Sequence, residues 1–173
     1  IFRAKKNDFS GLGISEEKIE SIRSQKILER ARRELDRIHK KSYTVLTIED
    51  KKYPPYLREI FDPPYVLYCV GNLDVLKDPA VSIVGARRCS PYGRAVAEKL
   101  AFELASRGLV IVSGMASGID SMAHWGALKG GRTVAVLGSG LNNIYPRENK
   151  DLFKKIKKSG AVITEYPLES KPL

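Results

Sequence analysis

From residue 79 onward, short apolar runs alternate with longer segments whose apolar residues recur every three or four positions. The runs occupy residues 81–84, 109–112, 133–137 and 161–164. Short apolar runs are typical of parallel strands covered on both faces, and the longer segments between them are typical of helices. We therefore predict an α/β fold with a mostly parallel sheet, right-handed crossovers and helices on both faces.

The helices between these runs have recognisable ends. Ser90 and Pro91 are a typical helix start, because serine accepts a free backbone N–H and proline loses no bond at the first helical position. This helix has its apolar positions at Val96, Leu100 and Leu104 and is expected to end near residue 107. Further helices are predicted from about residue 119 to 128 and at 147–158.

The first 42 residues have a different pattern and are predicted to be a short helical segment. Ser15 precedes two glutamates, as in a helix cap, and a second helix follows with apolar residues at spacings of one, three and four. The opposite face of that helix is crowded with cations, namely Arg30, Arg32, Arg33, Arg37, Lys40 and Lys41. A solvated face is favoured over direct contact with nucleic acid, because exposed helix faces are commonly charged.

Residues 43–173 form the second predicted domain, which begins with an extension that leads into the main sheet. Strands are expected at 43–48 and 65–70, and proline pairs flank a short helix at 56–60. Six aromatic residues of this extension are available for base stacking, although packing under the sheet is the favoured use. They are Tyr43, Tyr53, Tyr56, Phe61, Tyr65 and Tyr68.

The turn after the first strand predicts an anion site. Gly85 permits a sharp turn and a close backbone approach, and free N–H groups point outward at the helix start that follows. Arg87 and Arg88 add positive charge there. A dinucleotide fingerprint would need a second glycine where Arg87 stands, so the turn fits a bidentate grip on a backbone phosphate better than a pyrophosphate wrapped by bare backbone, and no cofactor is expected.

Two further glycine turns follow the next two strands. In a parallel sheet the loops after the strands emerge on one rim, where ligands bind. We therefore expect all three turns to share an edge with nearby basic side chains. The candidate nucleic-acid-binding residues are Gly85, Arg87, Arg88, Ser90, Ser113, Gly114, Ser117, Gly118, Gly138, Gly140, Arg147 and Lys150.

Charge and composition reduce the number of function classes that fit the sequence. The 173 residues carry a net charge of +10, which favours polyanionic partners. Two cysteines without C-x-x-C spacing and two histidines argue against a structural zinc site and against a disulfide framework. No apolar run is long enough to span a bilayer and no leader is recognisable, so we expect a cytoplasmic protein.

The combined motifs resemble the DNA-processing protein A family, also called DprA or Smf. The resemblance is carried by GARRCSPYGRAVAEKLAFELASRGLVIVSGMASGIDSMAHWGAL and by GGRTVAVLGSGLNNIYPREN. It implies an extended Rossmann-like fold and a protein without enzymatic activity that binds single-stranded DNA, protects incoming DNA, loads RecA during natural transformation and forms a homodimer. The family's G-x-R-x-x-S turn falls on Gly85, Arg87 and Ser90, and its basic residue after the Tyr-Pro pair falls on Arg147.

Two departures from the family pattern accompany this resemblance. Many relatives carry lysine where Ser117 stands, so this loop is expected to offer only backbone N–H groups. Relatives also continue beyond residue 173 with a basic segment and further strands, which implies that the chain is truncated and that the strand ending at Thr164 is an exposed edge.

Two other functions remain open at this point. One is a Rossmann-type nucleotide hydrolase related to the phosphoribohydrolases, although their Pro-Gly-Gly-x-Gly-Thr-x-x-Glu motif is missing. Asp120 is interpreted as structural and His124 as a packing residue, which leaves no obvious catalytic pair. The other is a protein-interaction module that uses the basic helix at residues 30–41.

Overall fold

The computed structural model describes residues 6–9 and 11–172, which fall into two compact units, Ile1–Lys41 and Ser42–Leu173. The first unit contains η1 (Lys6–Phe9), α1 (Glu16–Arg23) and α2 (Gln25–Lys40). Ser15 accepts a hydrogen bond from the backbone N–H of Lys18, so the predicted cap of α1 is confirmed.

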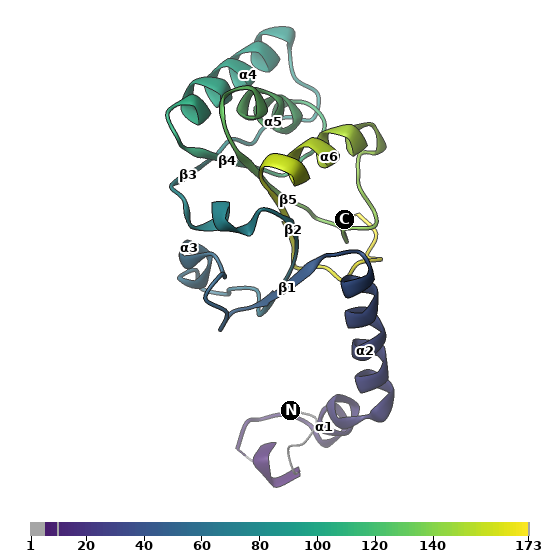
Figure 1. The fold of residues 1–173 in the computed structure, drawn as a ribbon. Helices are drawn as coiled ribbons and strands as arrows, with labels where there is room; N and C mark the ends of the chain where they lie inside the picture. Colours follow the sequence, from purple (N-terminus) through teal and green to yellow (C-terminus); the bar gives the residue numbers. More distant parts are fainter. Residues whose placement is uncertain (1–5, 10, 173) are drawn as a thin grey trace. The chain divides into compact units, whose positions relative to one another are not determined.

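The second unit is built on one six-stranded sheet (Figure 1). Its strands are β1 (Thr44–Thr47), β2 (Val66–Gly71), β3 (Ala80–Ser82), β4 (Val110–Ser113), β5 (Thr133–Val136) and β6 (Ala161–Thr164). They lie in the order β1-β2-β6-β5-β4-β3. The four strands from β3 to β6 are parallel to one another, whereas β1 and β2 pair antiparallel with each other and β2 with β6. The predicted α/β fold with a mostly parallel sheet is confirmed.

Two predictions about the edges of the sheet are wrong. The strand ending at Thr164 is central, because β2 pairs with the side of β6 that faces away from β5. The edge strands are β1 and β3, and β3 was expected to be buried. All three of its residues are exposed, since no strand among the described residues lies beyond it.

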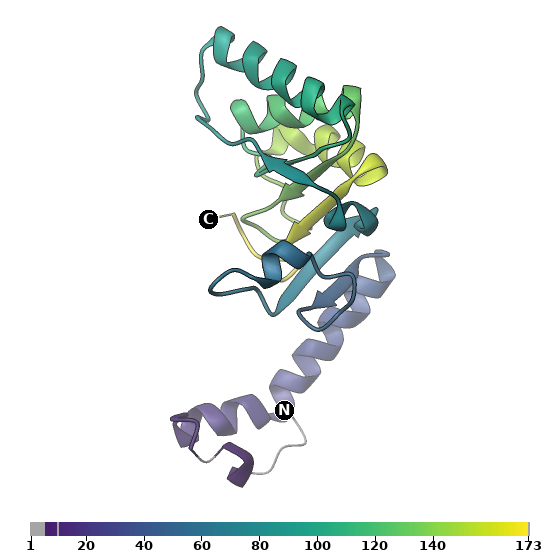
Figure 2. The same ribbon diagram turned by 90° about the vertical axis from the view of Figure 1, so that its left-hand side faces the viewer.

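The long helices of the second unit lie together on one face of the sheet, and short helical elements lie on the other (Figure 2). One face packs against α4 (Pro91–Ser106) and α5 (Ile119–Gly130), which bury Ala101, Ala105, Ala123 and Ala127 around Ile111 of β4. The third long helix, α6 (Lys150–Ser159), contacts β5 and β6. The short elements α3 (Pro55–Arg58) and η2 (Leu73–Lys77) pack on the core of the opposite face.

Helix α4 buries a different stripe from the one its large apolar residues suggest. Val96 and Leu100 are 43% and 45% exposed, whereas Ala97, Ala101 and Ala105 are buried. Small residues occupy the buried face of α4 because α4 and α5 approach closely. A Cβ at Gly126 would lie 2.0 Å from the backbone oxygen of Glu98, a residue of α4.

The aromatic residues of the extension include both buried and exposed side chains. Tyr53 is buried and donates a hydrogen bond of 2.7 Å to the backbone oxygen of Pro64, as expected for a packing residue. Tyr56, Phe61 and Tyr65 are exposed, so the packing interpretation is wrong for these three. Within the described part of the chain, no helix has both the length and the apolarity needed to cross a bilayer.

Candidate nucleic-acid interface

The loops that follow β3, β4 and β5 meet around one pocket of about 310 Å³. This is the arrangement predicted from parallel strands, because their carboxyl ends share one rim. The pocket also receives the end of the described chain, at Pro172. Its lining residues are Arg87, Gly114, Ala116, Ser117, Leu137, Gly138, Ser139, Tyr145, Pro146 and Pro172.

The first turn is shaped by Gly85 and Ser90. A Cβ at Gly85 would lie 2.8 Å from the side chain of Ile119, so glycine lets the turn approach the start of α5. Ser90 caps α4 by accepting a hydrogen bond of 3.1 Å from the backbone N–H of Gly93, as predicted. Arg87 and Arg88, between these two residues, are both exposed, and Arg87 lines the pocket.

Asp120 holds the first and second turns together. Its Oδ1 accepts the backbone N–H of Gly85 at 3.2 Å, and its Oδ2 accepts that of Gly114 at 3.1 Å. The side chain is buried, which makes these charge-assisted bonds costly to break. The interpretation of Asp120 as structural is therefore confirmed. The sequence does not reveal that its side chain bonds to two turns at once.

The second turn lies directly against the first. Gly118 has a φ of +84°, a conformation that favours glycine, and a Cβ there would lie 2.3 Å from the backbone oxygen of Ala86. The N–H of Ile119 donates to the same oxygen. This close stacking fixes the backbone that carries Arg87.

Asn149 connects the second turn to the segment that follows the third loop. This buried residue precedes α6, and its Nδ2 donates to the backbone oxygen of Met115 at 2.8 Å and to Oγ of Ser121 at 3.0 Å. Ser121 in turn donates to the backbone oxygen of Ala116. The segment 115–117, which contributes Ala116 and Ser117 to the pocket lining, is thus tied to α5 and α6 by buried hydrogen bonds.

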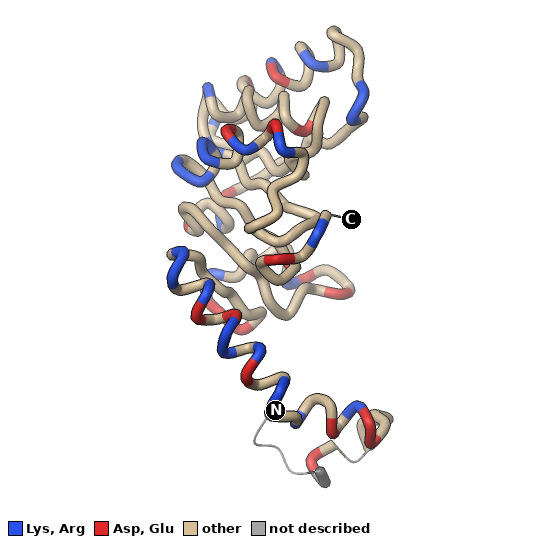
Figure 3. The backbone as a smooth tube through the Cα atoms, turned by 90° about the vertical axis from the view of Figure 1, so that its right-hand side faces the viewer, with Lys and Arg blue, Asp and Glu red and all other residues tan. Residues whose placement is uncertain are grey.

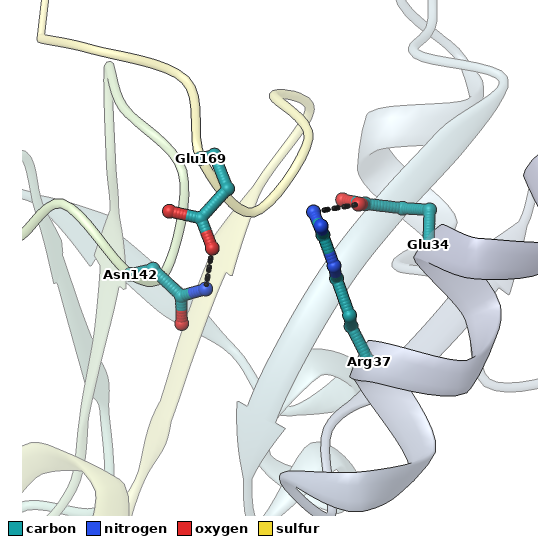
Figure 4. A network of polar contacts seen from close by, with 4 residues as sticks. All are labelled: Glu34, Arg37, Asn142 and Glu169. Atoms are coloured by element: carbon teal, nitrogen blue, oxygen red, sulfur yellow. Dashed lines mark hydrogen bonds and ion pairs between the residues drawn. The ribbon is translucent and has the colours of Figure 1, made fainter. Parts of the chain in front are cut away.

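The third loop is held by the end of the described chain. A Cβ at Gly140 would lie 2.1 Å from the backbone oxygen of Pro167, and the N–H of Gly140 donates to the backbone oxygen of Ser170 at 3.0 Å. Nδ2 of Asn142 donates to Oε1 of Glu169 at 2.6 Å (Figure 4). These bonds bring Pro172 to the pocket. The other pair in Figure 4, Arg37 and Glu34 at 3.9 Å, lies within α2 of the first unit.

The predicted site residues fall into three groups in the structure. Arg87, Gly114, Ser117 and Gly138 line the pocket. A second group shapes the loops without lining it, namely Gly85, Ser90, Gly118, Gly140 and Ser113, whose buried hydroxyl donates to the backbone oxygen of Ile83. The third group, Arg88, Arg147 and Lys150, is exposed outside the lining.

Sequence reasoning missed several lining residues, chiefly Tyr145 and Pro172. Tyr145 is 54% exposed and precedes a cis peptide bond to Pro146. The Tyr-Pro pair was itself a usable signal, because it stands in the third loop beside Arg147. Nothing local indicated Pro172, since its position depends on hydrogen bonds between segments about 30 residues apart in sequence.

The pocket lining presents one guanidinium, hydroxyl groups and glycine-rich backbone. Among the lining residues none carries a carboxylate, an imidazole or a thiol. Ser117 donates to Oε1 of Glu148 at 3.2 Å, so its hydroxyl has a partner and the loop offers mainly backbone. His124 is fully buried away from the pocket, and burial lowers its pKa to about 4.

Comparison with known proteins identifies related proteins for most of the chain. Residues 44–173 match the family model of DNA recombination-mediator protein A. DNA processing protein DprA of Streptococcus pneumoniae is 47% identical over 128 residues, a match covering 73% of this chain and 45% of that protein. DprA of Bacillus subtilis is 43% identical over 129 residues, covering 73% and 43%. The chain therefore spans less than half the length of these relatives.

Two solved structures share the fold. The X-ray structure of DNA processing protein A from Streptococcus pneumoniae superposes with a TM-score of 0.71 at 45% identity, covering 76% of this chain and 46% of that one. The protein from Helicobacter pylori superposes with a TM-score of 0.68 at 37% identity, covering 76% and 59%. The latter structure concerns a single-stranded DNA binding mode of the Helicobacter pylori protein.

Proposed function

Because the chain belongs to the DNA recombination-mediator protein A family, we propose that it binds single-stranded DNA at the pocket lined by Arg87. The observation that carries the proposal is the convergence of three strand-end loops on one pocket in which Arg87 supplies the positive charge. A guanidinium beside closely approachable backbone is suited to a phosphate group. The DNA binding mode described for the Helicobacter pylori relative supports the same choice of ligand.

The binding we propose is independent of base sequence. The lining offers the guanidinium of Arg87 and glycine-rich backbone, which suit the sugar-phosphate strand, whereas the hydroxyls of Ser117 and Ser139 already donate to Glu148 and to the backbone oxygen of Asn143. Tyr145 is the one aromatic residue among the lining residues, and base–aromatic stacking tolerates any base. Exposed Arg88, Arg147 and Lys150 extend the positive charge along the strand on either side.

The test is an affinity measurement by fluorescence anisotropy with matched variants. Labelled oligothymidine and a mixed-sequence single strand of equal length are titrated with the wild type, with Arg87→Ala and with Arg107→Ala. Arg107 follows α4 at the end remote from the first turn and is exposed, so its loss changes net charge equally. We expect the two single strands to bind within about threefold of each other and Arg87→Ala to weaken both by about tenfold or more, a loss of roughly 1.4 kcal/mol.

Cys89 offers a second readout at the same turn. It is a free, partly exposed thiol between Arg88 and Ser90. Bound oligothymidine should slow its modification by a thiol reagent. Equal losses of affinity in Arg87→Ala and Arg107→Ala, with unprotected Cys89, would overturn the assignment of the pocket.

The family membership supports a wider role. We propose that the protein acts as a cytoplasmic homodimer that protects incoming DNA and passes it to RecA in recombination. The support is the family membership alone, and co-sedimentation of RecA with the DNA-bound protein tests it. The hydrolase alternative makes a separate prediction, since it requires free base to be released from a nucleoside monophosphate. No such release is expected.

A further inference from the structure

A groove of about 430 Å³ lies between helices α5 and α6. The pocket lined by Arg87, called the DNA pocket below, lies elsewhere. It is formed by loops at the rim of the sheet where both helices begin. The lining residues of the groove come from the later turns of each helix, roughly 7 to 15 Å further along their axes at 1.5 Å per residue. They are Trp125, Leu128, Lys129, Lys155, Lys158 and Ser159.

The groove combines an apolar floor with a cationic wall. Trp125 and Leu128 are half-buried residues of α5 and form the apolar part. Nζ of Lys155 lies 4.7 Å from the centroid of the Trp125 ring. Lys155 and Lys158 are exposed and three residues apart, so both reach the same side of α6.

Lys155 and Lys158 are the cations of this wall without a direct ion pair among the described residues. Lys129 forms an ion pair with Glu98 of α4. Lys154 pairs with Asp151 at 2.9 Å, and Asp151, one turn before Lys155 on the same side of α6, also attracts Lys155 at longer range. Among the described residues no carboxylate lies within ion-pair distance of Lys155 or Lys158.

We propose that this groove binds an acidic peptide segment that carries one apolar or aromatic anchor residue. The anchor would lie against Trp125 and Leu128, and flanking carboxylates would pair with Lys155 and Lys158. Lysine ammonium groups are compact point charges suited to carboxylates. An anchor in a pocket with charged residues around it is also a common arrangement at peptide-binding interfaces.

A DNA strand fits the groove less well. The groove lies along the later turns of α5 and α6, away from the helix N-termini whose free N–H groups would hold successive phosphates. Nζ of Lys155 lies over the ring of Trp125, so a base cannot stack on that face of the ring. Because Lys129 is paired with Glu98, the available positive charge is limited to Lys155 and Lys158, which suits a short acidic segment better than a phosphate backbone that continues past the groove.

The chain provides its own probe for a direct test. Trp125 is the only tryptophan in the sequence, so its fluorescence reports on this groove alone. The ligand is a synthetic decapeptide with the core Asp-Asp-Phe-Asp-Asp, labelled at one end for anisotropy. We expect saturable binding at micromolar concentration, with a change in Trp125 emission.

Matched variants separate the groove from general charge attraction. Lys155→Ala with Lys158→Ala should weaken peptide binding at least tenfold, whereas Lys154→Ala with Lys157→Ala removes the same charge outside the groove and should change it less than twofold. All four side chains are exposed, and circular dichroism confirms that each variant is folded. A peptide with Ser in place of Phe, and one with Asn in place of Asp, should both lose at least tenfold.

The outcomes that overturn the proposal are equally specific. They are no binding at 1 mM peptide, or equal losses in the two double variants. Saturable quenching of Trp125 by oligothymidine that depends on Lys155 and Lys158 and persists in Arg87→Ala would assign the groove to DNA instead. The proposal does not rest on the DNA pocket, because Arg87→Ala is expected to bind the peptide normally.

Discussion

At the residue scale, a few buried polar side chains hold together the loops around the pocket lined by Arg87. Asp120 joins the first two turns, and Asn149 joins the second turn to the start of α6. Each satisfies backbone groups from segments distant in sequence. Single-residue changes at such positions therefore affect the pocket and the stability together.

The contribution of Asp120 to stability is measurable. Asp120→Ala leaves the N–H groups of Gly85 and Gly114 without their acceptors, and we expect the free energy of unfolding to fall by roughly 2 to 4 kcal/mol. Asp120→Asn keeps one carbonyl oxygen and should lose about half as much. Urea titration checks both values. A loss below about 0.5 kcal/mol in Asp120→Ala would show that the two bonds contribute little.

His124 predicts how stability depends on pH. Burial lowers its pKa from 6.5 to about 4, against an opposing effect from the backbone of Ser113, while its Nδ1 lies 2.6 Å from Oγ1 of Thr133. Between these two values the unfolded chain binds the extra proton, so stability is highest above pH 6.5. It should decline from pH 6.5 to about 4, by up to roughly 3 kcal/mol.

The control for this prediction is His124→Asn, which removes the titrating group. Urea titrations of both proteins at several pH values between 4 and 7.5 give the difference in slope. We expect the wild type to lose more stability than His124→Asn over this window. Parallel pH profiles would contradict the assignment of the proton uptake to His124.

At the element scale, local patterns predict which segments form helices and strands, and long-range contacts decide how these pack. The strand at 161–164 and the cap at Ser90 follow from residues next to each other in sequence. The burial of alanines in α4, in place of Val96 and Leu100, follows from how closely α5 approaches. The distance between α4 and α5 depends on tertiary packing, so the periodicity of apolar residues alone does not predict it.

Gly126 is the sharpest test of this helix contact. In an isolated helix Gly126→Ala would be stabilising, because alanine is the better helix former. Here the added Cβ would lie 2.0 Å from the backbone oxygen of Glu98, so we expect a loss of at least about 2 kcal/mol through overpacking.

Gly108→Ala provides the contrasting case. Gly108 has a φ of +90° with no atom within 4 Å of an added Cβ, so only backbone strain of about 1 kcal/mol is expected. Thermal or urea unfolding ranks the two variants. A Gly126→Ala protein as stable as the wild type would contradict the close approach of α4 and α5.

At the scale of the whole molecule, the sequence predicts the class of fold and the rim that carries the site, but not the order of all six strands. The antiparallel pairing of β1 and β2 beside β6 joins segments almost 100 residues apart. It makes β6 central and leaves β3 at the edge. The same kind of long-range contact brings Pro172 to the pocket, whereas Arg87 and the glycine turns were evident from local spacing.

The two units allow a prediction about the basic N-terminal helix. Cations along α2 alternate with acidic residues (Figure 3), and Arg37 lies 3.9 Å from Glu34. Both hydrophobic clusters described above come from the second unit. A chain reduced to residues 42–173 should therefore fold and bind oligothymidine with a smaller loss of affinity than Arg87→Ala causes. Anisotropy and thermal unfolding measure both, and a larger loss would assign DNA contacts to α2.

The central claim, that Arg87 contacts a DNA phosphate, is tested most directly by the salt dependence of oligothymidine binding. The slope of log K against log[salt] counts the phosphate contacts, at about 0.7 for each contact with a single strand. The slope for Arg87→Ala should be shallower than that of the wild type by about 0.7, whereas Arg107→Ala should keep the wild-type slope. Identical slopes for Arg87→Ala and the wild type would contradict the claim.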